Sequence, residues 1–348
     1  MTQPVRLAIA GAGLIGRRHA AAISAVPGVV LQAIVDPSDA GRAFAREIGA
    51  PWYASLGHML EHGDPAVRPD CVIVATPNRL HVENGLACVA AGIPALIEKP
   101  LASDLETAET LVAAGERAGV PLAVGHHRRH NPLIEAARQR LAAGDLGTIV
   151  AVHGMFWVMK PQDYFDTAWR REPGAGPLMI NLIHDIDLLR HLVGEIVWVR
   201  ALASNAVRGG AVEDTAAMLL RFESGALGSF SLSDTVVAPW SWELTAAENP
   251  AYPPTGQSCY FIGGTKASLQ LPDGRVWSHP GAASWEAPLS TTTHPVGRED
   301  PLVRQIAQFA RVVRGVEAPL VSAREGLATL RVIDALRRSA ATDQAVTL

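Results

Sequence analysis

Cysteine is scarce in this sequence, and its three cysteines are spread along the chain. Cys71, Cys88 and Cys259 form no CxxC pair, so the sequence predicts neither a disulfide framework nor a zinc knuckle. Runs of basic residues are missing as well: 30 Lys and Arg stand against 34 Asp and Glu, which excludes a positive stripe for nucleic acid. No apolar stretch approaches the ~20 residues that span a bilayer, so no membrane partner is expected.

The N-terminus lacks the pattern of a signal peptide. Its apolar run at residues 5–12 is interrupted by Arg6 and by two glycines, and no small-residue cleavage site follows. We therefore expect a cytoplasmic protein in a reducing compartment. Core-forming residues, by contrast, are plentiful, because 48% of the 348 residues are apolar. At about 100 to 200 residues per domain, this length predicts two domains.

The first part of the chain has the rhythm of a doubly wound α/β domain, expected over residues 1–124. Short runs rich in Val, Ile and Ala alternate with longer alanine-rich stretches, as in parallel strands joined by helices. The strands are expected at residues 6–10, 30–36, 71–75, 95–98 and 122–124, and the helices at 17–26, 40–48, 80–91 and 104–118.

The second part, residues 125–348, is predicted to be an α+β domain with an open, mainly antiparallel sheet. Strand-like runs follow one another directly at residues 148–158, 196–207, 214–222, 226–235, 242–247, 258–262 and 267–271, and turn signals separate neighbours. One helix is expected at residues 178–192, and two more, at 301–314 and 323–339, end the chain.

The turn after the first strand has the GxGxxG pattern of a dinucleotide-binding loop. Gly11 permits the turn, Gly13 lets the backbone approach a pyrophosphate, and Gly16 allows close packing of the helix that follows. Asp36 ends the second strand, where its carboxylate would bind a ribose 2'-hydroxyl and repel a 2'-phosphate. The sequence therefore predicts NAD as the cofactor and disfavours NADP.

Several motifs stand in an order and spacing that resemble the Gfo/Idh/MocA family of glucose-fructose oxidoreductase and inositol dehydrogenase, over nearly the whole chain. They are the glycine loop, Ala75-Thr76-Pro77-Asn78 followed by His81, Glu98-Lys99-Pro100, the segment 125–132, Trp169-Arg170, His184-Asp185-Ile186-Asp187 and the segment 263–269.

The resemblance implies an N-terminal Rossmann domain, a C-terminal α/β domain, nicotinamide bound at their junction, and a homodimer or homotetramer formed through the open sheet. It also implies that Lys99 and His184 are catalytic. Cofactor contacts are expected from Gly11, Gly13, Leu14, Ile15, Gly16, Asp36, Ser38, Ala75, Thr76, Pro77, Asn78, His81, Glu98 and Lys99.

The expected chemistry is proton transfer coupled to removal of a hydride from a carbinol carbon. Histidine suits the proton transfer near neutral pH, and the Lys99 ammonium would polarise the same oxygen. A satisfied buried histidine and a solvated lysine are the structural alternatives. Many family members carry an aspartate four residues before this histidine, where the chain has Ile180. Asn181, three residues before His184, would bind a substrate hydroxyl but carries no charge.

The loop before the helix of His184 is polar, aromatic and rich in glycine, which is typical of a substrate loop. Asp187 would orient the imidazole of His184, with a surface ion pair as the alternative. Three histidines at 126, 127 and 130 have no carboxylates nearby, so no metal site is expected. The expected substrate contacts are Lys99, His127, Lys160, Tyr164, Trp169, Arg170, Asn181, His184 and Asp185.

These observations indicate an NAD-dependent dehydrogenase for a secondary alcohol of a sugar, cyclitol or related polyol, or a reductase of the ketone. One alternative is a dehydrogenase of a carboxylated cyclic diol or hemiacetal. Another is a sensor that binds dinucleotide without catalysis. The presence of both Lys99 and His184 argues against the sensor, which needs no proton acceptor.

Overall fold

The computed structural model of the chain describes residues 3–62, 68–172 and 174–348. It divides into two compact units, one of Met1–His130 with Glu299–Leu330 and the other of Asn131–Arg298 with Arg331–Leu348. The sequence had indicated one boundary, after residue 124. The structure instead returns the segment Glu299–Leu330 to the first unit, because tertiary packing and not chain order decides where an apolar helix is buried.

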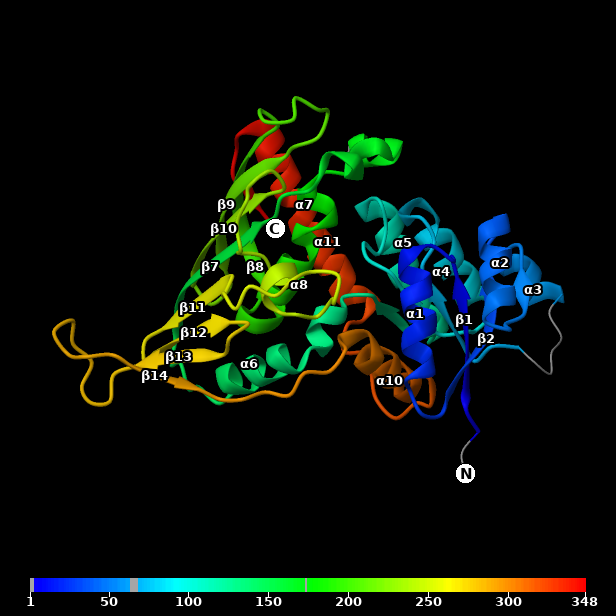
Figure 1. The fold of residues 1–348 in the computed structure, drawn as a ribbon, viewed down its shortest axis with the longest axis horizontal. Helices are drawn as coiled ribbons and strands as arrows, with labels where there is room; N and C mark the ends of the chain where they lie inside the picture. Colours follow the sequence, from blue (N-terminus) through cyan, green and yellow to red (C-terminus); the bar gives the residue numbers. More distant parts are fainter. Residues whose placement is uncertain (1–2, 63–67, 173) are drawn as a thin grey trace. The chain divides into compact units, whose positions relative to one another are not determined.

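The first unit contains a parallel sheet with the strand order β3-β2-β1-β4-β5-β6, which confirms the doubly wound prediction (Figure 1). Its strands are β1 (Val5–Ala10), β2 (Val29–Val35), β3 (Trp52–Tyr53), β4 (Cys71–Val74), β5 (Ala95–Ile97) and β6 (Leu122–Val124). The helices between them are α1 (Leu14–Ser24), α2 (Asp39–Glu47), α3 (Leu56–His62), α4 (His81–Ala90) and α5 (Leu105–Ala118), with short 3-10 turns η2 (Asn78–Leu80) and η3 (His127–His130).

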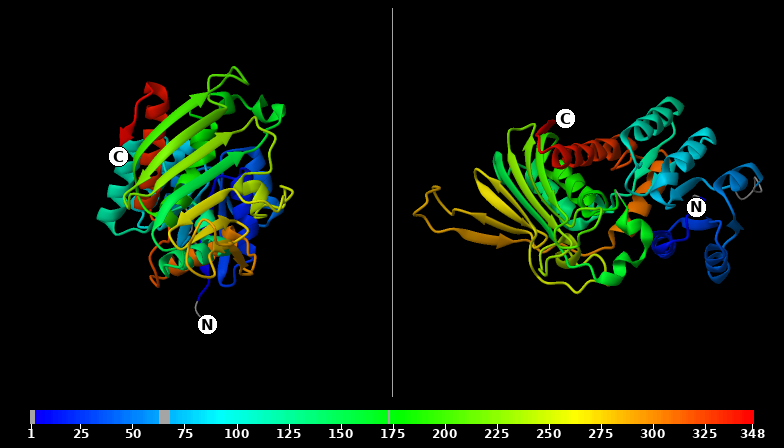
Figure 2. Two further views of the ribbon diagram at one scale, coloured as in Figure 1. Left: turned by 90° about the vertical axis from the view of Figure 1, so that its left-hand side faces the viewer. Right: turned by 90° about the horizontal axis from the view of Figure 1, so that it is seen from above.

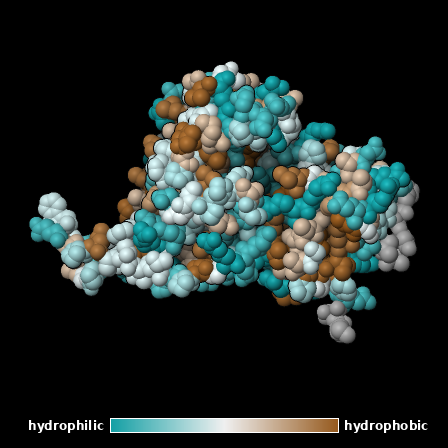
Figure 3. Space-filling view, in the orientation of Figure 1, coloured by the Kyte–Doolittle hydropathy of each residue, from teal (hydrophilic) through white to brown (hydrophobic). Residues whose placement is uncertain are grey.

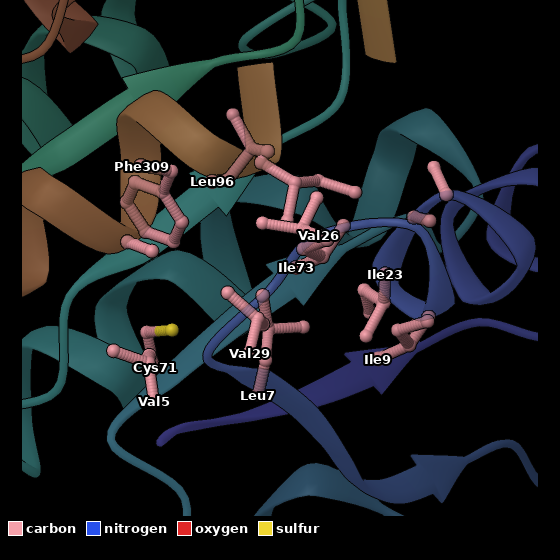
Figure 4. Packing of buried hydrophobic residues seen from close by; sticks show 14 of the residues in the cluster. Val5, Leu7, Ile9, Ile23, Val26, Val29, Cys71, Ile73, Leu96 and Phe309 are labelled. Carbon is pink, nitrogen blue, oxygen red and sulfur yellow. The ribbon is translucent and has the colours of Figure 1, made fainter. Parts of the chain in front are cut away.

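The strands of this sheet are mostly apolar, with Arg6 in β1 and Gln32 in β2 as exceptions, as expected of a parallel sheet covered by helices. One of the helices that pack on this sheet, α10 (Pro301–Val313), comes from near the end of the chain. Its residues Leu302, Ile306 and Phe309 belong to the same buried cluster as Val5 and Leu7 of β1. Figure 4 shows members of this cluster from β1, β2, β4, β5, α1 and α10. Helix α10 therefore completes the core of the first unit.

The second unit is built on a larger sheet with the order β14-β13-β12-β11-β7-β10-β9-β8-β15, in which β7 and β10 pair in parallel and all other neighbours are antiparallel. The prediction of a mainly antiparallel sheet is confirmed. The strands are β7 (Ile149–Trp157), β8 (Ile196–Ser204), β9 (Thr215–Phe222), β10 (Leu227–Ser233), β11 (Tyr260–Gly264), β12 (Ala267–Leu271), β13 (Arg275–Ser278), β14 (Ser290–Thr293) and β15 (Val346–Thr347).

Helices cover one face of this sheet, and the left panel of Figure 2 presents the other face to the viewer. The helices are α6 (Pro132–Ala142), α7 (Pro177–Ile180), α8 (Leu182–Val193), α9 (Trp242–Thr245) and the last part of α11 (Ala323–Thr342), with the turns η4 (Gln162–Asp166) and η5 (Ala168–Arg171). Every residue of α8 from Leu182 to Leu192 is buried. Among the described helices none is both long and apolar enough to cross a membrane.

Two local predictions were wrong, and several elements were not predicted. Residues 242–247, expected as a strand, contain the short helix α9, because Ser241 accepts a hydrogen bond from the Leu244 amide and caps its start. The helix expected at residues 178–192 is broken at Asn181, whose φ of −105° and ψ of −57° separate α7 from α8. Helix α6, begun by an Asn131 cap and Pro132 at its first turn, and strands β13, β14 and β15 were not predicted.

Candidate active site

The glycine loop after β1 is shaped for a phosphate group. Gly11 has a φ of +99°, and a Cβ there would lie 2.3 Å from the Ala75 carbonyl oxygen. A Cβ on Gly16 would lie 1.9 Å from the Gly11 oxygen, whereas the same atom on Gly13 would have nothing within 4 Å. The loop is therefore closely packed at Gly11 and Gly16 but open at Gly13, next to the N-terminus of α1. This shape fits a dinucleotide pyrophosphate.

Asp36 is fixed beside this loop by its own hydrogen bonds. Oδ2 accepts from the Ala12 amide at 2.7 Å, and Oδ1 accepts from the Ser38 amide at 2.9 Å and from its hydroxyl at 2.5 Å. Burial by itself would raise the pKa of Asp36, but these bonds and the charge of Arg17 outweigh burial and lower it. The carboxylate thus stands ionised and oriented where a ribose hydroxyl is expected.

His81, expected among the cofactor contacts, ties two loops of the first unit together. Its ring is buried, with Nδ1 at 2.7 Å from the Pro100 carbonyl oxygen and Nε2 at 2.9 Å from the Thr76 carbonyl oxygen. Burial lowers its pKa. The side chain therefore holds the backbone of Thr76, a predicted cofactor residue, and of Pro100, which follows the predicted cofactor residue Lys99.

Glu98 is a buried anion beneath the turn that carries Lys99. Its Oε1 lies 2.6 Å from His19 Nε2, and its Oε2 accepts from the Lys99 amide at 3.2 Å. Burial opposes ionisation, but the hydrogen bond with His19 and the charges of His19, His127 and Lys99 lower the pKa of Glu98 to about 2. A Cβ on Gly125 would lie 2.8 Å from this carboxyl, so only glycine fits there.

His127 is one of the expected substrate contacts. Burial, together with the charges of Arg128, Arg18 and Lys99, lowers its pKa to about 3. In the part of the chain that the structure describes, no group of His, Cys, Asp or Glu could hold a metal ion.

In the second unit, His184 lies in the first turn of α8 with 8% of its surface exposed. Its neighbour Asp185 is fully buried and accepts a hydrogen bond from the Tyr260 hydroxyl. The Tyr260 hydroxyl thus links α8 to the sheet. Asp185 has this partner within the protein, whereas the sequence predicted a contact with substrate. Asp187 is 1% exposed, which excludes the surface ion pair considered from the sequence.

Lys160, Asn181 and Asp234 form a connected group in the second unit. The ammonium of Lys160 donates to Asn181 Oδ1 at 2.7 Å and lies 3.2 Å from Asp234 Oδ2. Arg208 Nε lies 3.2 Å from the other Asp234 oxygen. Burial lowers the pKa of Lys160, although the charge of Asp234 opposes this. Sequence reasoning did not find Asp234 or Arg208, because nothing local marks a partner that lies far along the chain.

Aromatic rings and cations meet in the neighbouring loop. The Arg170 guanidinium lies 4.0 Å from the centroid of the Tyr164 ring, and Lys160 Nζ lies 4.9 Å from the same centroid. Arg170 also donates to the Tyr164 carbonyl at 2.8 Å and lies 5.6 Å from the Trp169 ring, which is 49% exposed. The structure therefore brings together five of the predicted substrate residues within one unit: Lys160, Tyr164, Trp169, Arg170 and Asn181.

The fold and the glycine loop define a dinucleotide-binding oxidoreductase with a second, α+β unit. Residues 5–126 match the oxidoreductase family with an NAD-binding Rossmann fold, and residues 134–270 match the GFO/IDH/MocA C-terminal domain. The chain belongs to the Gfo/Idh/MocA family.

Relatives along the whole chain agree with this assignment. The 1,5-anhydro-D-fructose reductase of Ensifer adhaerens is 29% identical over 98% of this chain and 97% of its own, and the scyllo-inositol 2-dehydrogenase (NAD(+)) of Bacillus subtilis is 31% identical over 71% of each. The crystal structure of the WlbA dehydrogenase from Bordetella pertussis, in complex with NADH and UDP-GlcNAcA, is 26% identical, with a TM-score of 0.79 over 99% of both chains. The predictions of an oxidoreductase and of NAD as its cofactor are confirmed.

Proposed function

We propose that this protein oxidises a secondary alcohol of a sugar, cyclitol or related polyol, or reduces the corresponding ketone. The observation that supports this most is the similarity to relatives named for such substrates: 1,5-anhydro-D-fructose, scyllo-inositol and levoglucosan. NAD, when bound, exchanges a hydride with the substrate carbon.

In this proposal His184 takes the proton of the substrate hydroxyl. An imidazole has an unperturbed pKa of about 6.5, so it exchanges a proton readily near neutral pH. Its place in the first turn of α8, in the same unit as Lys160 and Asn181, supports the role. Lys99 donates a hydrogen bond to the reacting oxygen and stabilises its developing negative charge. The buried Glu98 fixes the Lys99 backbone for this task.

A second candidate is a dehydrogenase of a carboxylated cyclic diol or hemiacetal. It is supported by a relative named 4-carboxy-2-hydroxymuconate-6-semialdehyde dehydrogenase, 29% identical over 66% of this chain. The non-catalytic sensor has no such support, and a sensor has no use for the proton-accepting His184.

Formation of NADH across a panel of neutral sugars, cyclitols and sugar acids tests the proposal. We expect turnover with at least one polyol, and loss of that turnover in Lys99→Ala and His184→Ala. NAD binding by calorimetry without turnover of any substrate would favour the sensor.

A further inference from the structure

We propose that Asn181, Lys160 and Arg170 form a binding site for a carboxylate group of the substrate. This inference rests on the proposed function and narrows its substrate class to polyols that carry an acid group. The site lies entirely within the second unit, so it needs no placement of the two units relative to each other.

The orientation of the Asn181 amide follows from its partner. An ammonium has N–H donors and no acceptor, so the Asn181 atom that lies 2.7 Å from Lys160 Nζ is its carbonyl oxygen. Lys160 is itself held in place, because its side chain is 10% exposed and pairs with Asp234, which is 2% exposed and also bound by Arg208. Turning the Asn181 oxygen toward a ligand would leave the Lys160 ammonium short of an acceptor.

What remains for a ligand is a set of donors. The Nδ2 group of Asn181 has no partner among the described residues, and the Lys160 ammonium, with its three N–H groups, has two described acceptors, Asn181 and Asp234. The Nε of Arg170 is a buried donor without a partner in the described part of the chain. Lys160 and Arg170 approach the same Tyr164 ring, so these donors belong to one neighbourhood.

The unused donors of Asn181 and Lys160 favour an acceptor group as their ligand. A carboxylate has two oxygens that accept and none that donates, so it uses these donors more fully than a hydroxyl, which has one oxygen and a proton of its own to donate. Two of the three donating side chains are cations, which strengthens hydrogen bonds to an anion.

The acid group would lie close to the reacting carbon. The His184 amide donates to the Asn181 carbonyl oxygen at 3.2 Å, so the two residues stand one helical turn apart. Side chains at that spacing are neighbours, with about 5–6 Å between their Cβ atoms. A hydroxy acid or uronic acid of small size spans this separation.

Binding to the NADH-loaded protein tests the inference directly. L-Tartrate and L-threitol are matched probes, because they differ only in having carboxylates or CH2OH groups at the ends. We expect tartrate to bind at least tenfold more tightly by calorimetry. Asn181→Asp removes the donor and adds a negative charge, and it should weaken tartrate binding about 10- to 100-fold and threitol binding much less.

Two further variants serve as controls. Asn249→Asp makes the same change of charge in the same unit, where the Asn249 side-chain oxygen accepts from the Ala251 amide and is retained, so tartrate binding should stay as in the wild type. Asn181→Leu removes the donor without adding charge and should also weaken tartrate binding. A thermal unfolding transition like that of the wild type reports that each variant, including its second unit, is folded.

The outcomes separate this inference from the proposed function. Equal binding of tartrate and threitol, or full tartrate affinity in Asn181→Asp, would overturn the carboxylate site even if neutral polyols are oxidised. Selective tartrate binding that Asn181→Asp abolishes would support the site. If in addition no member of the substrate panel yields NADH, that result counts against the proposed oxidation. It does not count against the carboxylate site.

Discussion

His19 Nε2 and Glu98 Oε1 lie 2.6 Å apart, and both side chains are withdrawn from solvent. The pair joins α1, whose first turn faces the glycine loop, to the turn that carries Lys99. Because a buried carboxylate is costly without a partner, each residue depends on the other. The cofactor loop and the proposed catalytic lysine are thereby connected through one buried hydrogen bond.

This pair predicts an acid-dependent loss of stability. The folded pKa of Glu98 is about 2, below its ordinary 4.5, so ionised Glu98 stabilises the fold above about pH 4.5 and the stabilisation disappears as pH falls toward 2. The difference corresponds to about 3 kcal/mol of unfolding free energy. Urea unfolding at about pH 6 and about pH 3.5 measures the part of this difference that is lost by pH 3.5, about 1.4 kcal/mol. Glu98→Gln should lose less stability between these two conditions than the wild type; an identical loss would contradict the role of Glu98.

The geometry of Asp36 predicts cofactor preference. We expect the protein to bind NAD more tightly than NADP, and Asp36→Ala to narrow the difference by roughly 1 to 3 kcal/mol, because a charge-assisted bond is lost and repulsion is relieved. Since Asp36 also accepts from the Ala12 amide, the variant should weaken NAD binding itself. Calorimetry with both cofactors decides this. Equal or better NADP affinity in the wild type would refute the prediction.

Replacement of His184 tests the assignment of the base. His184→Ala should lower kcat about a hundredfold to ten-thousandfold with nearly unchanged NAD affinity, because general base catalysis contributes in that range. Lys99→Ala should lower kcat and weaken binding as well. Asn181→Ala should chiefly raise KM, since a binding group stabilises ground and transition states alike. If His184→Ala turned over normally while Asn181→Ala were crippled, the base would have to be sought elsewhere.

The uncovered face of the second sheet predicts a dimer or tetramer. Leu219 on β9 and Leu227 on β10 are 54% and 59% exposed on that face, and Figure 3 shows hydrophobic residues along the left-hand margin of the second unit. An apolar surface of this kind is typical of an interface. Light scattering at micromolar concentration should show an oligomer that Leu219→Lys with Leu227→Lys dissociates. The control, Val237→Lys, changes an 85% exposed valine outside the strands and should have no effect; a monomeric wild type would exclude the interface.

Local patterns were sufficient to predict the parallel sheet, the glycine loop and the position of Lys99. The reason is that each has a signature in the local sequence: Gly16 approaches the Gly11 backbone within the same loop, and buried strands read as apolar runs. The Asn181 break was missed because apolar residues surround it at helical spacing. The composition of residues 242–247 favours a strand, but the hydrogen bond that the Ser241 side chain accepts from the Leu244 amide stabilises a short helix instead.

By itself the sequence determined the two kinds of fold, the family and the residues able to carry proton transfer, because chain order and periodicity encode them. The tertiary structure alone decided which of these side chains meet. It placed Asp234 and Arg208 against Lys160, turned the Asn181 oxygen toward that lysine, and buried Asp185 against Tyr260. Hydrogen bonds between residues far apart in the chain have no local signature, and the direction of an amide is set by its partner rather than by its neighbours in sequence.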